Sequence, residues 1–212
     1  MRRSLRGLGS AAAALTLAAC AAAPVRYYTL ANPATPPAAP LRGGAAIHFE
    51  MAPVGVPERL ARPQMVVRNE ADASSTSVNV LEQQRWTSSF DSELRDAFGV
   101  AIAARLGAVD VTRGGHLPGH PVYRIAVQVR QFDATLAKEV DARFGWTITR
   151  SDDDRNAVCQ ALASQAVGPG MDELVQGIQR VVAATADRIA AQIAALQESR
   201  TARCPNPAST DS

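Results

Sequence analysis

The sequence predicts an α+β fold: a single domain with a mostly antiparallel sheet and two long helices packed on one face, behind a lipidated flexible tether. Apolar and polar residues alternate over residues 123–130 and 140–149, which indicates paired strands with one buried face. Apolar residues recur at spacings of three and four over 90–106 and 171–197, which indicates two amphipathic helices. A short apolar run that ends in a cysteine, followed by proline-rich chain, indicates an exported and anchored protein.

The N-terminus has the layout of a secretory signal, with three arginines before an uncharged, alanine-rich run over residues 8–19. A membrane-spanning helix needs about 20 predominantly apolar residues. The uncharged run that begins at residue 8 is shorter, because Pro24 and Arg26 end it. The sequence Leu17-Ala18-Ala19-Cys20 resembles a bacterial lipobox. We therefore predict a signal peptide over residues 1–19 and a Cys20 thiol that carries fatty acyl chains such as palmitate. The alternative is an ordinary signal peptide that contains a cysteine.

Composition limits the class of protein. The chain of 212 residues is 47% hydrophobic and 20% charged, which supports one domain with a substantial core. Removing the signal takes three of the 22 Lys+Arg residues and none of the 20 Asp+Glu residues, which leaves the mature chain close to neutral. Its arginines are scattered, so no electrostatic footprint for nucleic acid is present and we exclude nucleic-acid binding.

The three cysteines divide simply if Cys20 carries lipid. Cys159 and Cys204 then remain as a pair in an exported chain, where disulfides persist. We predict a Cys159–Cys204 disulfide that stabilises the fold by about 2–4 kcal/mol. The alternative is two free thiols in unrelated places.

Residues 20–44 are expected to form the lipidated, proline-rich tether. Extended chain of this kind spans about 3.1 Å per residue, so the whole segment reaches several nanometres from a membrane. An exception is the aromatic, β-prone segment Tyr27-Tyr28-Thr29-Leu30, which we expect to dock on the domain as an edge strand. The domain itself is expected over residues 45–200, with a C-terminal tail over 201–212.

The first half of the domain reads as short strands and one helix. Residues 46–56 begin as a strand, and segments 65–68 and 78–81 suggest a hairpin around a polar turn region. Ser88 has the pattern of a helix N-cap, with Asp91 in the capping-box position three residues later. The helix that follows is expected to end at Gly107, before a short strand over 109–112 and an exposed Gly/Pro loop.

The second half reads as a meander and a helix. The two alternating runs are expected to pair as an antiparallel hairpin, and a third strand over 156–163 follows a polar turn. The last helix, 171–197, is long enough to cover a sheet face, and Cys159 and Cys204 are expected to meet at its far end. Its apolar stripe comprises Leu174, Ile178, Val181, Val182, Thr185, Ile189, Ile193 and Leu196.

The sequence offers weak signals for a catalytic or metal site. Asp152, Asp153 and Asp154 are adjacent, without the alternating ligand spacing of a calcium loop, so a solvated turn is the better interpretation. The histidines, His48, His116 and His120, have no third ligand nearby in sequence. No nucleophile elbow, phosphate loop or paired catalytic carboxylates appear. We expect a non-catalytic protein without metal or cofactor; a hydrolase would need a triad assembled from distant residues.

Several motifs in this order resemble the ABC-type transport auxiliary lipoproteins. The most specific are Arg62-Pro63-Gln64 and Arg85-Trp86. Ala61 stands where the family commonly has an acidic residue, and Thr87-Ser88-Ser89 replaces a more acidic, proline-containing stretch. The other matching segments are the lipobox, Tyr27 to Leu30, Val54-Gly55-Val56-Pro57, Leu60 to Arg68 and the alanine-rich final helix.

The resemblance implies a non-enzymatic accessory subunit of an intermembrane lipid transport system that contributes to membrane integrity. Its partners would be an MCE-domain protein and the ABC permease and ATPase components, and the domain would assemble as a homo-oligomer. Ala21 follows the lipidated cysteine, which favours the periplasmic face of the outer membrane over retention at the inner membrane. The alternative is a structural or assembly-adaptor lipoprotein of the cell envelope without a transport partner.

Two motifs are candidate partner-binding residues. The first is Arg62, Pro63 and Gln64, because a rigid proline-bracketed loop presents side chains at little ordering cost. Its alternative is a structural turn anchored by Arg62. The second is Arg85 and Trp86, since Arg and Trp are enriched at interface hot spots. For Trp86 the alternative is packing in the core just before a helix.

Overall fold

The computed structural model describes residues 23–31, 47–68, 76–115, 119–153, 155–199 and 202–204. The predicted lipobox with Cys20, the proline-rich residues 32–46, His116, Asp154 and the tail beyond Cys204 lie outside the described residues. The elements in chain order are β1 (Arg26–Tyr28), β2 (His48–Met51), the 3₁₀ helix η1 (Glu58–Leu60), β3 (Gln64–Arg68), β4 (Val78–Trp86), α2 (Phe90–Leu106), β5 (Val109–Asp110), β6 (Val122–Thr135), β7 (Glu139–Arg150), β8 (Asn156–Ala166) and α3 (Met171–Glu198).

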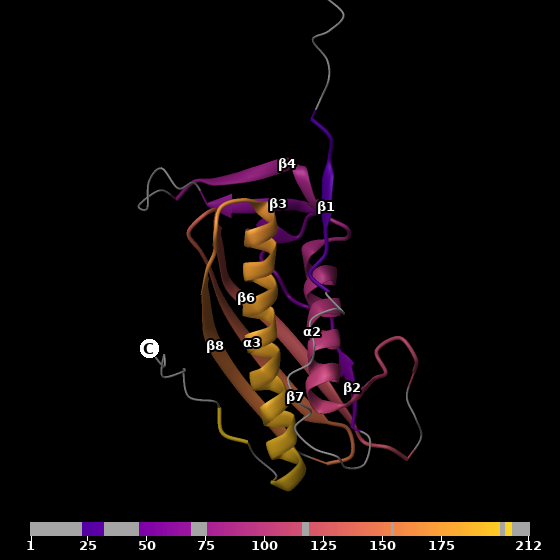
Figure 1. Cartoon of the computed structure of the whole chain (residues 1–212). Helices are drawn as coiled ribbons and strands as arrows, with labels where there is room; N and C mark the ends of the chain where they lie inside the picture. Colours follow the sequence, from indigo (N-terminus) through magenta and orange to yellow (C-terminus); the bar gives the residue numbers. More distant parts are fainter. Residues whose placement is uncertain are drawn as a thin grey trace, which may run out of the picture.

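The elements form two layers. All the described strands join one open sheet, and α2 and α3 lie side by side against one face of it (Figure 1). The opposite face of β6, β7 and β8 is open to solvent, as the alternation of their side chains predicts. The predicted α+β class, with two long helices on one face of the sheet, is confirmed.

The sheet combines long antiparallel ladders with short parallel ones. β6, β7 and β8 pair antiparallel along most of their length, as do β3 and β4. The short ladders of β1 with β4 and of β2 with β5 and β6 are parallel. The sheet is therefore mixed, because alternation along a strand reports which side faces the core and not which strand lies beside it.

The strand predicted over residues 123–130 continues to Thr135 as β6. Its pairing with β7 shifts between Val129 and Gln131, and Arg130 and Gln131 are both exposed. Phe132 then returns to the core, so the strand resumes with its alternation displaced by one residue. This irregularity ended the regular pattern in the sequence and made the predicted strand too short.

The start of α2 differs from the prediction. The helix begins at Phe90 with Ser89 at its N-cap, and the Ser89 side chain makes no capping hydrogen bond. The predicted capping box of Ser88 and Asp91 is wrong, because the Ser88 hydroxyl and N–H both donate to the Glu93 carboxylate. The predicted end at Gly107 is correct, with this glycine in the left-handed conformation at φ 62°.

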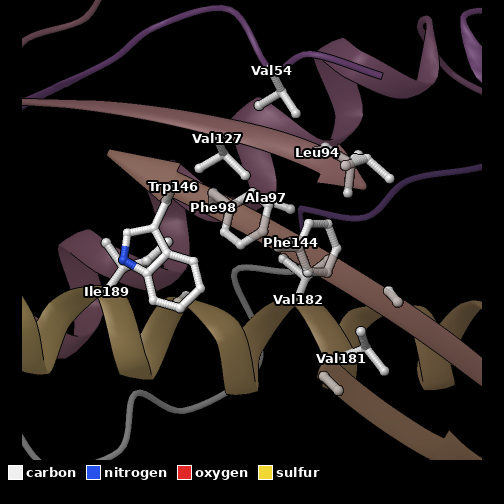
Figure 2. Close-up of a cluster of buried hydrophobic side chains, with 14 of the residues drawn as sticks. Val54, Leu94, Ala97, Phe98, Val127, Phe144, Trp146, Val181, Val182 and Ile189 are labelled. Atoms are coloured by element: carbon white, nitrogen blue, oxygen red, sulfur yellow. The ribbon is translucent and has the colours of Figure 1, made fainter. Parts of the chain in front are cut away.

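The core lies between the helices and the sheet. Every member of the predicted α3 stripe is buried, and Ile189 is 0% exposed. Figure 2 shows Ile189 and Val182 of α3 on the side of the helix that faces Phe144 and Trp146 of β7. From α2, the Phe98 ring meets Phe144 edge to face at 5.4 Å between centroids. Apolar side chains from both helices and the sheet thus form one continuous cluster.

Candidate functional site

Three sequence motifs that lie far apart in the chain converge at the junction of β1, β3 and β4. Tyr27 of β1 pairs with Arg85 of β4, and Arg85 pairs on its other side with Gln64 of β3. Backbone hydrogen bonds complete the junction: the Trp86 N–H donates to the Pro63 carbonyl at 2.7 Å. The edge-strand docking predicted for residues 27–30 is therefore confirmed. We call this region, with Tyr27, Tyr28, Pro63, Gln64, Arg85 and Trp86, the motif junction.

Polar side chains on β4 hold the motif junction together. Residues 82–84 of β4 bulge where its register with β3 shifts, which places Glu82 beside two motif residues. Arg85 Nε donates to the Glu82 carbonyl at 2.8 Å, and Gln64 Nε2 lies 3.4 Å from the Glu82 carboxylate. On the β1 side, the Tyr28 hydroxyl donates to Gln84 Oε1 at 2.8 Å. These contacts fix the side chains of β4 between the two flanking strands.

The Trp86 side chain packs in the hydrophobic core. It is 4% exposed, and its ring stacks on Phe90 at 5.5 Å between centroids, while Phe90 meets Phe132 of β6 at 4.9 Å. The aromatic series links the end of β4 to the start of α2 and to the sheet. Of the two interpretations of Trp86, the structure therefore favours core packing.

Arg62 and Pro63 occupy the turn between η1 and β3. Pro63 is exposed, whereas Arg62 is half-buried and its Nε atom is buried with no hydrogen-bond partner among the described residues. The Arg62 backbone N–H donates to the Leu60 carbonyl at 2.7 Å. The turn is thus held by its backbone and by Leu60, a buried residue, and it presents Pro63 to solvent.

Glu93 of α2 is the central polar group beside the motif junction. It is 4% exposed, and its two carboxylate oxygens bind donors from two separate segments of chain. One oxygen accepts hydrogen bonds from the Leu30 N–H and the Thr29 hydroxyl, both at 2.9 Å. The other accepts from the hydroxyls of Thr87 and Ser88 and from the Ser88 N–H. Glu93 therefore ties the segment after β1 to the loop between β4 and α2.

These hydrogen bonds determine the ionisation of Glu93. Burial disfavours the charged form and by itself would raise the pKa of the carboxyl. The donors from Thr87, Leu30, Thr29 and Ser88 stabilise the carboxylate and outweigh burial, so the pKa of Glu93 lies below its ordinary value of 4.5. Sequence reasoning missed this residue. A glutamate in the first turn of a helix looks like an exposed group that favours the helix dipole, and its burial depends on docking of residues 29–30.

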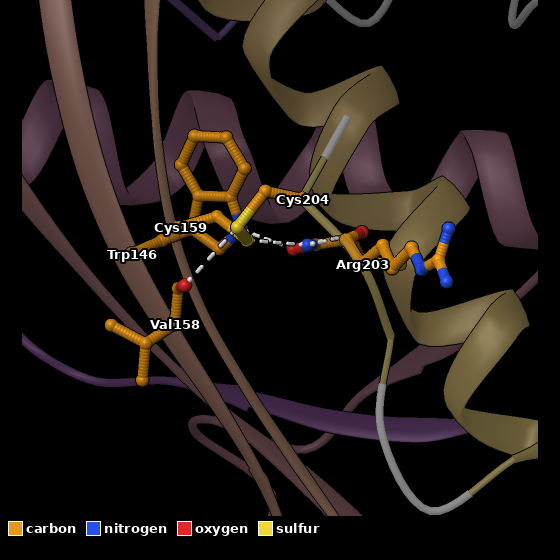
Figure 3. Close-up of a disulfide and its surroundings, with 6 residues drawn as sticks. Trp146, Val158, Cys159, Arg203 and Cys204 are labelled. Carbon is orange, nitrogen blue, oxygen red and sulfur yellow. Dashed lines mark hydrogen bonds between the residues drawn. A yellow bond between two sulfur atoms is a disulfide. The ribbon is translucent and has the colours of Figure 1, made fainter. Parts of the chain in front are cut away.

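The predicted disulfide joins Cys159 of β8 to Cys204 and closes a separation of 45 residues (Figure 3). It lies beside Gln192 of α3, which is 2% exposed. Gln192 Oε1 accepts a hydrogen bond from the Trp146 indole N–H at 2.6 Å, and its Nε2 donates to the Arg203 carbonyl at 3.2 Å. Arg203 and Cys204 are therefore attached to α3 and β8, near the end of the helix as expected.

The described residues contain no group of three or more His, Cys, Asp and Glu side chains arranged to hold a metal ion. His48 and His120 lie 5.2 Å apart between ring centroids, with His48 buried. In the turn before β8, Asp152 pairs with Arg150 at 2.8 Å and Asp153 with Arg155 at 3.0 Å. These two carboxylates are thus neutralised by neighbouring arginines.

No helix among the described residues has the length and apolar character needed to cross a membrane. No curated protein matches the sequence. Two solved structures share the fold at low sequence identity. An uncharacterized protein is 17% identical with a TM-score of 0.58, and the alignment covers 81% of this chain and 99% of that one. A DUF330 protein from Xanthomonas campestris is 15% identical with a TM-score of 0.55, covering 84% and 99% of the two chains.

The sequence comparison identifies the family. The family described as "ABC-type transport auxiliary lipoprotein component" matches residues 28–190, from the second tyrosine of β1 to within the last third of α3. The matched region contains the motif at residues 62–64 and the motif at residues 85–86. It also contains Glu93 and the whole β6–β8 meander. The chain therefore belongs to the ABC-type transport auxiliary lipoprotein family.

Proposed function

We propose that this protein is a non-catalytic, lipid-anchored accessory subunit of an MCE and ABC-type intermembrane lipid transport system, and that it contributes to membrane integrity. The observation that carries the proposal is the family match over residues 28–190. Lipid on Cys20 anchors the chain at the periplasmic face of the outer membrane. The folded domain works in the periplasm as a homo-oligomer beside the MCE protein and the permease components.

The motif junction is the proposed contact with the MCE protein. Its exposed groups are Tyr27, which is 63% exposed, and Pro63. Gln64 and Arg85 are half-buried and already contact Glu82. Their side chains therefore lose little conformational entropy when a partner binds. Trp86 supports this surface from below by packing against Phe90.

The test is site-specific photo-crosslinking in the native host. A photoreactive amino acid replaces Tyr27 or Pro63 in the full-length protein, and a matched variant carries it at Thr149, an exposed residue at the end of β7. After irradiation the protein is extracted from membranes and purified. Mass spectrometry identifies the captured chains and the modification at Cys20.

Capture of an MCE protein from Tyr27 or Pro63, and not from Thr149, would support both the transport role and the contact surface. An MCE protein that co-purifies without crosslinking at the motif junction would keep the transport role and refute the surface. Acylated protein without any MCE or permease partner would instead favour an envelope adaptor. An unacylated mature chain would contradict the anchor.

A further inference from the structure

The docking of β1 determines how far the domain can lie from a lipid on Cys20. Residues 26–28 are paired with β4, and Leu30 directly after them is 2% exposed. Glu93 binds the Thr29 hydroxyl and the Leu30 N–H, and Gln179 of α3 donates to the Thr29 carbonyl at 3.1 Å. Residues 26–30 are therefore part of the folded domain.

Only residues 21–25 separate Cys20 from β1. Whatever their conformation, a fully extended chain spans at most ~3.3–3.6 Å per residue, so the six steps from Cys20 to Arg26 cover roughly 20 Å. The proline-rich residues 32–46 join β1 to β2 and add nothing to this reach. A connection of this length is shorter than the domain is long, because the 28 residues of α3 alone span about 40 Å.

Several exposed apolar side chains lie on the strands next to this connection, among polar residues such as Asn79 and Glu82. The described residues include eight exposed large hydrophobic side chains, and four of them lie just before β1, on β1 or on β4: Val25, Tyr27, Val78 and Val80. Figure 1 shows β4 across the same end of the molecule at which the chain before β1 leaves. Arg26, also exposed, adds a positive charge with no ion-pair partner among the described residues. We call this surface the β1–β4 end.

We propose that the β1–β4 end rests on the phospholipid surface of the leaflet that holds the Cys20 lipid. This inference rests on the proposed lipidation. Tyrosine partitions to the membrane–water interface because its ring is amphipathic, and an exposed arginine attracts anionic headgroups. The contact is too small to hold the domain on a membrane by itself. The short connection keeps it at high local concentration beside the bilayer, so even a weak contact is occupied.

This arrangement orients the whole domain. The helices run away from the β1–β4 end, so α3 would stand away from the membrane with its C-terminal end on the side away from the lipid (Figure 1). The hairpin of β3 and β4 would lie along the headgroups. Tyr27 would lie at the boundary of the headgroup layer, and Tyr27, Pro63 and Gln64 would be available only to a partner that also approaches the bilayer.

The test uses the full-length, acylated protein in vesicles of phosphatidylethanolamine and phosphatidylglycerol. With Cys20 acylated and Cys159 bonded to Cys204, one introduced cysteine is the single free thiol for a fluorophore. The label is placed at Val80 on β4, or at Thr149 as the matched control at the other end of the sheet. Lipids that carry a quencher in the headgroup region report on proximity. Mass spectrometry of the N-terminus accompanies each sample.

We expect strong quenching at Val80 and little at Thr149. Inserting 20 Gly and Ser residues between Ala23 and Pro24 should reduce the Val80 quenching towards the Thr149 value, because the local concentration falls. Equal quenching at the two sites in acylated protein would overturn this inference and leave the transport role intact. Unchanged Val80 quenching after the insertion would overturn the role of the short connection. An unacylated Cys20 would remove the proposed anchor and this inference with it.

Discussion

The carboxylate of Glu93 accepts a hydrogen bond from the backbone N–H of Leu30 at 2.9 Å, across 63 positions of sequence. Leu30 follows a strand of only three residues, and such a short ladder would fray without further support. The bond therefore makes the N-terminal strand a stable part of the domain.

Replacing Glu93 with Gln should lower the free energy of unfolding by about 2–3 kcal/mol. The variant loses hydrogen bonds to a charged acceptor, and its new amide N–H₂ group faces hydrogen-bond donors that previously bound a carboxylate oxygen. Urea unfolding followed by circular dichroism measures this change. Glu58→Gln in the exposed first turn of η1 is the matched control and should change stability little. A Glu93→Gln variant as stable as the control would contradict the role of this carboxylate.

The lowered pKa of Glu93 predicts acid sensitivity. In the unfolded chain the carboxyl titrates near its ordinary value of 4.5, and in the folded protein it titrates lower. Its contribution to stability is therefore complete above 4.5 and is lost as the pH falls through the lower, folded-state pKa. The pH dependence of unfolding below 4.5 should be shallower in Glu93→Gln than in the wild type. Parallel profiles for the two proteins would argue against this linkage.

Loss of the disulfide should destabilise the fold. For a closed loop of about 45 residues the chain-entropy estimate is about 4 kcal/mol, at the upper end of the usual range. Cys204→Ser should lower the thermal unfolding temperature and increase hydrogen exchange at Gln192 and Trp146, which the disulfide adjoins. A reductant should destabilise the wild type and have no further effect on the variant. Equal stability of the two oxidised proteins would contradict this prediction.

The packing of α3 on the sheet is tested by Ile189→Asp. The side chain is 0% exposed, so the substitution buries an unpaired charge, and we expect a loss of about 3–5 kcal/mol or failure to fold. Ala184→Asp on the exposed side of the same helix is the control, with little expected change. Thermal unfolding by calorimetry separates the two. Similar melting temperatures would overturn the proposed packing.

Two glycines should respond differently to alanine. At Gly177 of α3 a new Cβ would lie 2.2 Å from Val167 Cγ1, a buried group, so we expect destabilisation by about 1–3 kcal/mol despite the better helix propensity of alanine. Adding Val167→Ala should restore most of the loss. At Gly55 the new Cβ would meet the end of the exposed Gln128 side chain, which can rotate away, so a small effect is expected. Denaturant unfolding of the wild type, Gly177→Ala, Gly177→Ala with Val167→Ala, and Gly55→Ala measures both effects.

The sequence predicted the elements well where one face of an element meets the core. Alternation located β6 and β7, and the spacing of Leu174 to Leu196 located α3, because periodicity directly records which side chains are buried. It could not predict the parallel pairing of β2 with β6 or of β1 with β4. Those neighbours are chosen by tertiary packing over long separations, which leaves no local pattern.

The candidate site was predicted in part. The motifs at residues 62–64 and 85–86 were recognised separately, and the structure brings them together through Gln64 and Arg85. Glu93 was missed because a charged residue early in a helix has no signature of burial. Its environment requires Thr29 and Leu30, and their docking required the β1–β4 ladder to be known first.

The parallel pairing of β1 with β4 also bears on mechanical load. Figure 1 shows β1 in line with the direction in which the preceding chain leaves the domain. A pull from that end acts along the strand and strains its interstrand hydrogen bonds together in shear, instead of peeling them one at a time. The hydrogen bond from the Leu30 N–H to Glu93 then connects the end of this segment to α2. If the chain is anchored through Cys20, the short strand would resist tension applied at the N-terminus and transmit it to the core of the domain.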